Sequence, residues 1–219
     1  VLEVGSRLPT GAQRLGRIEP QMLRRMTFET FDVRGNNPSD QQRRSLEHAY
    51  SYARNYAAHP ERWLVLTGDT GVGKTHLAVA VASERLKGGQ PVFFTMVADL
   101  LDHLRATFGP NSAVTYDQMF EEVRNTPLLI LDDLGKERSS PWAEEKLHQI
   151  IVHRHNGRLP TVITSMVDFT RPEVQGPIYS RIQDPDAGEL FKMDAPDYRS
   201  KQRSRQGLRR GRARGATTS

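Results

Sequence analysis

The sequence predicts an α/β fold built on a mostly parallel sheet. Short apolar runs alternate with stretches of helical periodicity along most of the 219 residues, which is the pattern of strands joined by crossover helices. A glycine-rich segment follows the first apolar run, and two adjacent aspartates end a later one. Both features fall where strands are expected to end, and this edge of an open α/β sheet is where ligands bind.

The first long helix is expected to begin after Ser39. Pro38 precedes this residue, and Ser39 and Gln42 stand in capping-box register, in which each residue accepts a backbone hydrogen bond from the other. Apolar residues then recur at helical spacing until His59 and Pro60 interrupt the pattern. The residues of this apolar face are Leu46, Tyr50, Ala53 and Ala57.

Apolar runs bounded by glycine, proline or polar residues are expected to form the strands. They cover residues 63–66, 92–94, 128–131 and 161–163, with a weaker run at 189–192. Helical periodicity separates them, at residues 75–86, at 100–108, at 116–123 and after Pro141.

The composition is that of one folded domain with a basic end. Hydrophobic residues make up 37% of the chain and charged residues 26%. Eight of the 31 basic residues and none of the 26 acidic ones lie in residues 199–219, so residues 1–198 carry 23 basic residues against 26 acidic ones. We expect a poorly ordered leader over residues 1–25, with at most a short helical turn, a domain over 26–198 and a basic disordered tail over 199–219.

Composition also excludes several classes of function. The chain has no cysteine, which excludes disulfides, cysteine-ligated zinc and a thiol nucleophile and is in keeping with a cytoplasmic protein. No stretch approaches the roughly 18 apolar residues that a membrane-spanning helix needs, so no membrane partner is expected.

The glycine-rich segment matches the phosphate-binding pattern G-x-x-x-x-G-K-[ST] in full. It follows an expected strand and leads into an expected helix, so its backbone N–H groups and the helix dipole would face an anion. Lys74 would contact the β- and γ-phosphates, and the Thr75 hydroxyl could bind Mg²⁺. The alternative is a glycine-rich turn with an incidental lysine. The candidate ATP-binding residues are Gly68, Asp69, Thr70, Gly71, Val72, Gly73, Lys74 and Thr75.

The paired aspartates end the apolar run of residues 128–131. Asp132 continues that strand and is expected to face Mg²⁺, directly or through water. Asp133 should lie on the opposite side of the pleat, where it could orient or deprotonate an attacking water. The alternative is a pair of turn acids before Gly135, or a helix cap. Together with the phosphate loop, the pair favours hydrolysis by water over transfer to a small acceptor.

Five segments in this order resemble the DnaC/IstB-like AAA+ ATPases, the bacterial helicase loaders and transposition helpers. The segments are GDTGVGKTHLAVAVA, LLILDDLG, TVITS, IYSRI and DAPDYR, and the resemblance covers residues 27–199. It implies a P-loop NTPase of AAA+ type with sheet order 5-1-4-3-2, and ATP and Mg²⁺ bound between the subunits of an ATP-dependent homo-oligomer. Lys74 and Thr75 would be the Walker A pair, and Asp132 and Asp133 the Walker B pair.

The resemblance also implies roles for two arginines. Arg181 of the IYSRI segment would be the arginine finger that reaches the neighbouring subunit's ATP, and Arg199 would be the sensor-2 arginine on its own nucleotide. The alternative for Arg181 is a surface arginine on an amphipathic turn.

The chain departs from the family pattern at the sensor-1 position. Family members usually carry Asn after the Thr-Ser of this strand, whereas here Met166 follows Thr164 and Ser165. Either Thr164 or Ser165 substitutes for the asparagine, or hydrolysis is slow.

Two regions are candidates for contact with single-stranded DNA. Arg105 and Arg124 are the basic candidates between the second and third strands, where acids are also frequent and an ordinary pair of crossover helices is the alternative. In the tail, arginine density predicts non-specific, salt-sensitive phosphate contact, and the alternative is a solubilising terminus. The tail candidates are Arg203, Arg205, Arg209 and Arg210.

These observations lead to four hypotheses. The first is a DnaC-type ATPase that assembles on DNA and loads a replicative helicase. The second is an IstB-type transposition helper whose partner is a transposase. The third is a nucleotide-dependent binding module with little hydrolysis, and the fourth, less favoured by the sequence, is a small-molecule kinase.

Overall fold

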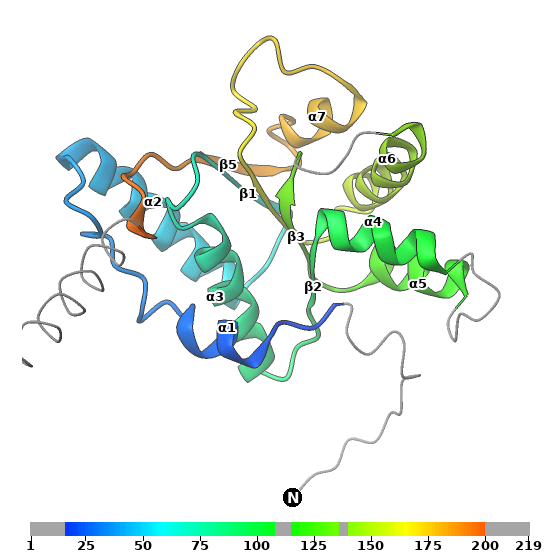
Figure 1. Cartoon of the computed structure of the whole chain (residues 1–219), viewed down its shortest axis with the longest axis horizontal. Coiled ribbons are helices and arrows are strands. Elements are labelled where there is room, and N and C mark those ends of the chain that lie inside the picture. The colour runs from blue at the N-terminus through cyan, green and yellow to red at the C-terminus, as the bar shows by residue number, and fades with distance from the viewer. Residues whose placement is uncertain (1–15, 108–114, 136–139, 200–219) are drawn as a thin grey trace, which may run out of the picture.

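The computed structural model describes residues 16–107, 115–135 and 140–199 (Figure 1). Its centre is a five-stranded sheet of order β2-β3-β4-β1-β5 in which every neighbouring pair is parallel. Read from the other edge, this is the predicted order 5-1-4-3-2, and the predicted fold class is confirmed. The strands are β1 (Trp63–Thr67), β2 (Phe93–Met96), β3 (Leu129–Leu134), β4 (Thr161–Ser165) and β5 (Gly188–Lys192).

Helices cover both faces of the sheet (Figure 1). One face carries α1 (Pro20–Arg25), α2 (Asp40–Ala58) and α3 (Lys74–Lys87). The other carries α4 (Val97–Ala106), α5 (Tyr116–Asn125), α6 (Pro141–Asn156) and α7 (Pro177–Ile182). Within the described ranges, no helix combines the length and the apolar character needed to cross a membrane.

The alternation of side chains along β1 builds a core on each face. Leu64 and Leu66 pack with the α2 and α3 side, whereas Trp63 and Val65 pack with the α4, α5 and α6 side. All five residues of this central strand are buried. A strand covered on both faces reads as one continuous apolar run, and such a run at residues 63–66 is what predicted β1 from the sequence.

The predicted start of α2 is confirmed in detail. The Ser39 hydroxyl accepts a hydrogen bond from the Gln42 N–H at 3.2 Å, and the Gln42 side chain accepts one from the Ser39 N–H at 3.0 Å. This capping box satisfies two backbone donors that the first turn leaves free.

Part of the leader expected over residues 1–25 packs on the domain. Gly16 forms an antiparallel β-bridge with Phe94, and the Phe94 N–H donates to the Gly16 carbonyl at 3.1 Å. Ile18 is buried, and α1 follows it. Residues 16–25 therefore belong to the folded unit, although their sequence shows no sustained period.

Candidate functional site

The glycine loop joins β1 to α3 as predicted. Gly68 and Gly73 have φ angles of +138° and +107°, which L side chains rarely adopt. A Cβ atom at Gly68 would collide with the Met193 carbonyl, and one at Gly73 would press on the Phe31 ring. The loop thus needs glycine for its own packing, in addition to the phosphate approach inferred from the sequence.

Lys74 begins α3 with its side chain turned back over the loop. Its ammonium group donates to the Gly68 carbonyl at 2.7 Å and to the Asp69 carbonyl at 2.8 Å. The residue is buried, so these charge-assisted bonds help to compensate its desolvation. They hold a positive charge against the loop whose N–H groups would receive a phosphate.

Asp132 meets the glycine loop across the sheet edge. The Thr75 hydroxyl donates to its carboxylate, at 3.0 Å from Oδ1 and 3.1 Å from Oδ2. Burial raises the pKa of the Asp132 carboxyl, while hydrogen bonds from Thr164 and Thr75 oppose the rise. The expected Walker A and Walker B side chains are therefore in direct contact.

Asp133 owes its orientation to a bulge in β3. Three steps from Leu131 to Leu134 on β3 face only two steps from Ile163 to Ser165 on β4, and Asp133 has a φ of +60°. A bulge re-aims the side chains beside it. Asp132 is buried, while Asp133 is partly exposed and lines a cavity, so the two side chains have different surroundings.

The cavity has a volume of about 730 Å³ and opens over the glycine loop. Lys74, Thr75 and Asp133 line it at the carboxyl edge of the sheet. Phe31 and Arg199, which lie near the beginning and at the end of the described sequence, also line it. The α1 helix adds further wall. Sequence reasoning missed α1 and Phe31 as parts of the site. The available signal was a pair of aromatic residues three positions apart, Phe28 and Phe31.

The segment before Arg199 is hydrogen-bonded to the glycine loop. The Tyr198 N–H donates to the Gly71 carbonyl at 3.2 Å, and the Arg199 N–H donates to Asp197 Oδ1 at 2.9 Å. Asn36 donates its side-chain N–H to the Asp197 carbonyl at 3.3 Å. These bonds bring the predicted sensor-2 position to the same cavity as Lys74.

The three residues at the sensor-1 position are placed differently. Thr164 donates to Asp132 Oδ1 at 2.6 Å. Ser165 points away, donating to the Leu134 carbonyl at 2.6 Å and accepting from the Val167 N–H at 2.9 Å. Met166 is 41% exposed, and the Thr70 hydroxyl lies 3.4 Å from its sulfur.

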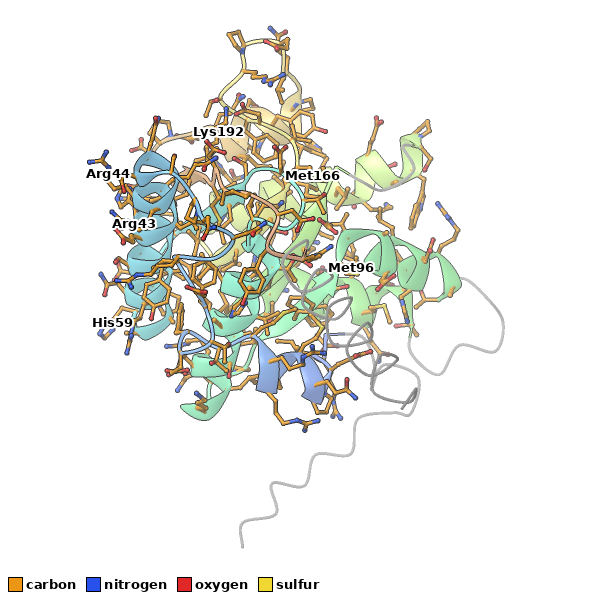
Figure 2. All side chains as sticks on the ribbon, turned by 60° about the vertical axis from the view of Figure 1, so that its left-hand side comes forward. Arg43, Arg44, His59, Met96, Met166 and Lys192 are labelled. Carbon is orange, nitrogen blue, oxygen red and sulfur yellow. The ribbon has the colours of Figure 1, made fainter. Side chains whose placement is uncertain are left out.

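Figure 2 labels Met166 together with Met96, the last residue of β2. Both methionines are 41% exposed, and both stand at the carboxyl ends of their strands, the edge that carries Asp132. They form a matched pair for testing the sensor-1 position.

Arg181 is not among the residues that line the cavity. It lies in α7, where its guanidinium donates to the Pro177 carbonyl at 2.6 Å. The structure therefore does not bring Arg181 to the cavity over the glycine loop of its own chain.

The two arginines suggested for DNA contact have partners within the chain. Arg105 pairs with Asp102 at 3.6 Å and lies 4.9 Å from the Trp142 ring centre. Arg124 pairs with Glu121 at 2.8 Å and contacts His153 Nδ1 at 2.9 Å. The tail candidates Arg203, Arg205, Arg209 and Arg210 lie outside the described residues.

A glycine loop between a strand and a helix, with Lys-Thr facing an aspartate from another strand of a 2-3-4-1-5 sheet, defines a P-loop protein of AAA+ type. Residues 13–174 match the family described as IstB-like ATP binding protein. The match covers well over half of the chain, and the chain belongs to this family. The ATP-binding character predicted for the site is thus a property of its family.

Similar proteins include helicase loaders. The chain is 27% identical over 135 residues to the replicative helicase loader DnaC of Escherichia coli (strain K12), covering 62% of this chain and 53% of that protein. A crystal structure of the DnaC helicase loader matches with 27% identity and a TM-score of 0.64, over 80% of this chain and all of that one. The chain spans about half the length of the curated relatives it matches.

A more distant likeness extends to replication initiators. The initiator DnaA, bound to AMPPCP and single-stranded DNA, matches with 19% identity and a TM-score of 0.61, over 81% of this chain and 51% of that one. At this identity the likeness concerns the fold alone.

Proposed function

We propose that this chain hydrolyses ATP and uses the cycle of binding and hydrolysis to assemble on single-stranded DNA and load a replicative helicase. The observation that carries the enzymatic part is the bond between Thr75 and Asp132 beside a cavity lined by Lys74 and Asp133. This function implies a cytoplasmic location.

Nucleotide binding would use the glycine loop. Its N–H groups and the amino-terminal end of α3 attract the β- and γ-phosphates. Lys74 would exchange its bonds to the Gly68 and Asp69 carbonyls for bonds to phosphate oxygens. Because the ammonium is already desolvated, this exchange costs less than burying a hydrated lysine.

The residues beside the loop suit Mg²⁺. Thr75 and Asp132 offer a hydroxyl and a carboxylate, which are hard oxygen ligands, and Mg²⁺ is usually held by one or two carboxylates together with water and substrate phosphates. When bound, Mg²⁺ would neutralise charge that develops on the phosphates. Thr75 would bind through its oxygen, with Asp132 as a ligand or as acceptor of the Thr75 proton.

Hydrolysis would start at Asp133. Its carboxylate would accept a proton from water as the water oxygen bonds to the γ-phosphorus, and the bond from that phosphorus to the β–γ bridging oxygen would break. ADP and phosphate are then the products. Arg199 would contact the nucleotide of its own chain, and Arg181 that of a neighbouring subunit, where each would offset the charge of the triphosphate.

Similarity to DnaC loaders supports a helicase as the partner, with single-stranded DNA as the surface for assembly. A transposase is the alternative partner, and it is favoured by the match to the IstB-like family. A nucleotide-dependent binding module with little hydrolysis is the further alternative, and it is favoured by Met166, which offers no hydrogen-bond donor at the sensor-1 position.

The test combines turnover with partner capture. Purified protein is assayed for phosphate release from ATP with and without single-stranded DNA, and then used with ATP to capture partners from its source cells. Turnover with recovery of a hexameric helicase supports the proposal, and recovery of a transposase establishes the alternative. Binding of ATP without measurable turnover would leave only the binding-module function.

A further inference from the structure

We propose that Thr164 is a positioning residue that sets the geometry of the Asp132–Asp133 pair, and that it does so without contacting the attacking water. This inference rests on the proposed ATPase function and deepens it. It assigns to the β4 threonine a role different from that of a sensor-1 side chain.

Thr164 stands directly opposite the bulge. The shift of register places two residues of β3, Asp132 and Asp133, against this single residue of β4. Its hydroxyl donates to Asp132 Oδ1 at 2.6 Å and accepts from the Asp133 backbone N–H at 2.9 Å. One side chain thus bonds to the carboxylate of the first aspartate and to the backbone of the second.

The hydroxyl has no proton left for water. A threonine hydroxyl has one donor hydrogen, and the short bond to Asp132 uses it. Thr164 is fully buried, with 0% exposure, whereas Asp133 lines the cavity. Thr164 therefore acts on the site through the two aspartates.

The bond to the Asp133 N–H has a particular consequence. Asp133 has a φ of +60°, an uncommon conformation that persists only where surrounding bonds favour it. Without the Thr164 oxygen, this N–H would lose the acceptor that it has here, and the bulge would lose one of the contacts that fix its orientation. Groups that orient metal ligands typically change metal affinity or activity by about 10- to 100-fold when removed.

The neighbouring Ser165 provides a matched control. It is also fully buried on β4, but its hydroxyl bonds to the Leu134 carbonyl and the Val167 N–H. Removal of the Ser165 hydroxyl deletes two hydrogen bonds at a buried position of the same strand without removing a bond to either aspartate. It reports the effect of general weakening of β4.

The experiment compares Thr164→Val, Thr164→Ser and Ser165→Ala in the full chain. Valine keeps the branched shape and removes the hydroxyl, and serine keeps the hydroxyl. Binding of Mn²⁺, as a spectroscopic substitute for Mg²⁺, is measured by electron paramagnetic resonance with a non-hydrolysable ATP analogue present. The Mg²⁺ dependence of ATP turnover and the thermal midpoint are measured alongside.

Thr164→Val is expected to weaken Mn²⁺ binding by about 10-fold or more and to lower kcat. For Thr164→Ser and Ser165→Ala, both the Mn²⁺ affinity and kcat are expected to stay within about threefold of wild type. If valine prevents folding, Thr164→Cys replaces it with the same expectation, since a thiol is a weak donor. Unchanged Mn²⁺ affinity and kcat in the valine or cysteine variant would overturn the inference, as would an equal loss in Ser165→Ala. A wild type that binds Mn²⁺ with nucleotide but never releases phosphate would refute the ATPase, while the Mn²⁺ comparison would still decide the role of Thr164.

Discussion

The Thr75 hydroxyl lies 3.0 Å from Asp132 Oδ1, although 57 positions separate the two residues in sequence. Thr75 lies in the first turn of α3, which follows β1, and Asp132 belongs to β3, so the bond crosses the end of the intervening β4. Thr164 of β4 donates to the same carboxylate from between them. The carboxyl ends of β3 and β4 and the first turn of α3 are thus joined at one side chain.

Asp133→Asn is expected to abolish turnover while preserving nucleotide binding. Asparagine tolerates the positive φ of this position and cannot accept a proton from water. General-base catalysis contributes about 100-fold or more, so kcat should fall by at least that factor, measured as phosphate release at saturating ATP. Asp102→Asn, at an exposed residue of α4, is the control; equal rates for the Asp133 variant and wild type would remove the assigned base.

Met166→Asn is expected to raise kcat. An amide at this position can hydrogen-bond to water, and a neutral hydrogen bond contributes about 1 kcal/mol, or about fivefold in rate if it forms only in the transition state. Met96→Asn is the matched control, because both methionines are 41% exposed at the same sheet edge. If kcat of Met166→Asn is equal to or lower than that of wild type, Met166 does not limit hydrolysis.

Arg181→Ala is expected to lose turnover and to regain part of it when mixed with Lys74→Ala. The first variant keeps an intact nucleotide cavity and the second keeps the arginine, so a mixed interface contains both. At a head-to-tail interface, a working site needs Lys74 from one subunit and Arg181 from its neighbour. When the two variants mix at random in equal amounts, about one quarter of the sites should have both. Arg171→Ala is the control, at an exposed arginine paired with Asp168.

Failure of the mixture to exceed its two components would contradict a role of Arg181 across subunits. Wild-type turnover by Arg181→Ala alone would exclude any catalytic role. An arginine finger contributes about a thousandfold or more to kcat, so a small effect would argue against this assignment as well.

Much of the fold could be predicted because local patterns and tertiary contacts agree. The capping box at Ser39, the apolar run of β1 and the loop ending in Lys74 each depend on neighbours in sequence, and each is confirmed. The sheet order came from a family resemblance, because pairing of strands far apart along the chain leaves no local signal.

Features that depend on distant contacts could not be predicted. Arg154 is fully buried on α6, where its guanidinium donates to the Thr161 hydroxyl and to the Arg124, Thr126 and Pro160 carbonyls. In sequence it is one arginine among 25. The bulge at Asp133 is equally hidden, since it arises from the register between β3 and β4.

The most direct test is calorimetric titration of MgATP into wild type, Lys74→Ala and Lys87→Ala. Lys87 is exposed in the last turn of the same helix and pairs with Glu84, so its loss should leave affinity unchanged. The account predicts saturable binding by wild type and by Lys87→Ala, with Lys74→Ala weaker by about 10-fold or more because a charge-assisted phosphate contact is lost. Absence of binding by wild type, or equal affinity in Lys74→Ala, would contradict nucleotide binding by this loop.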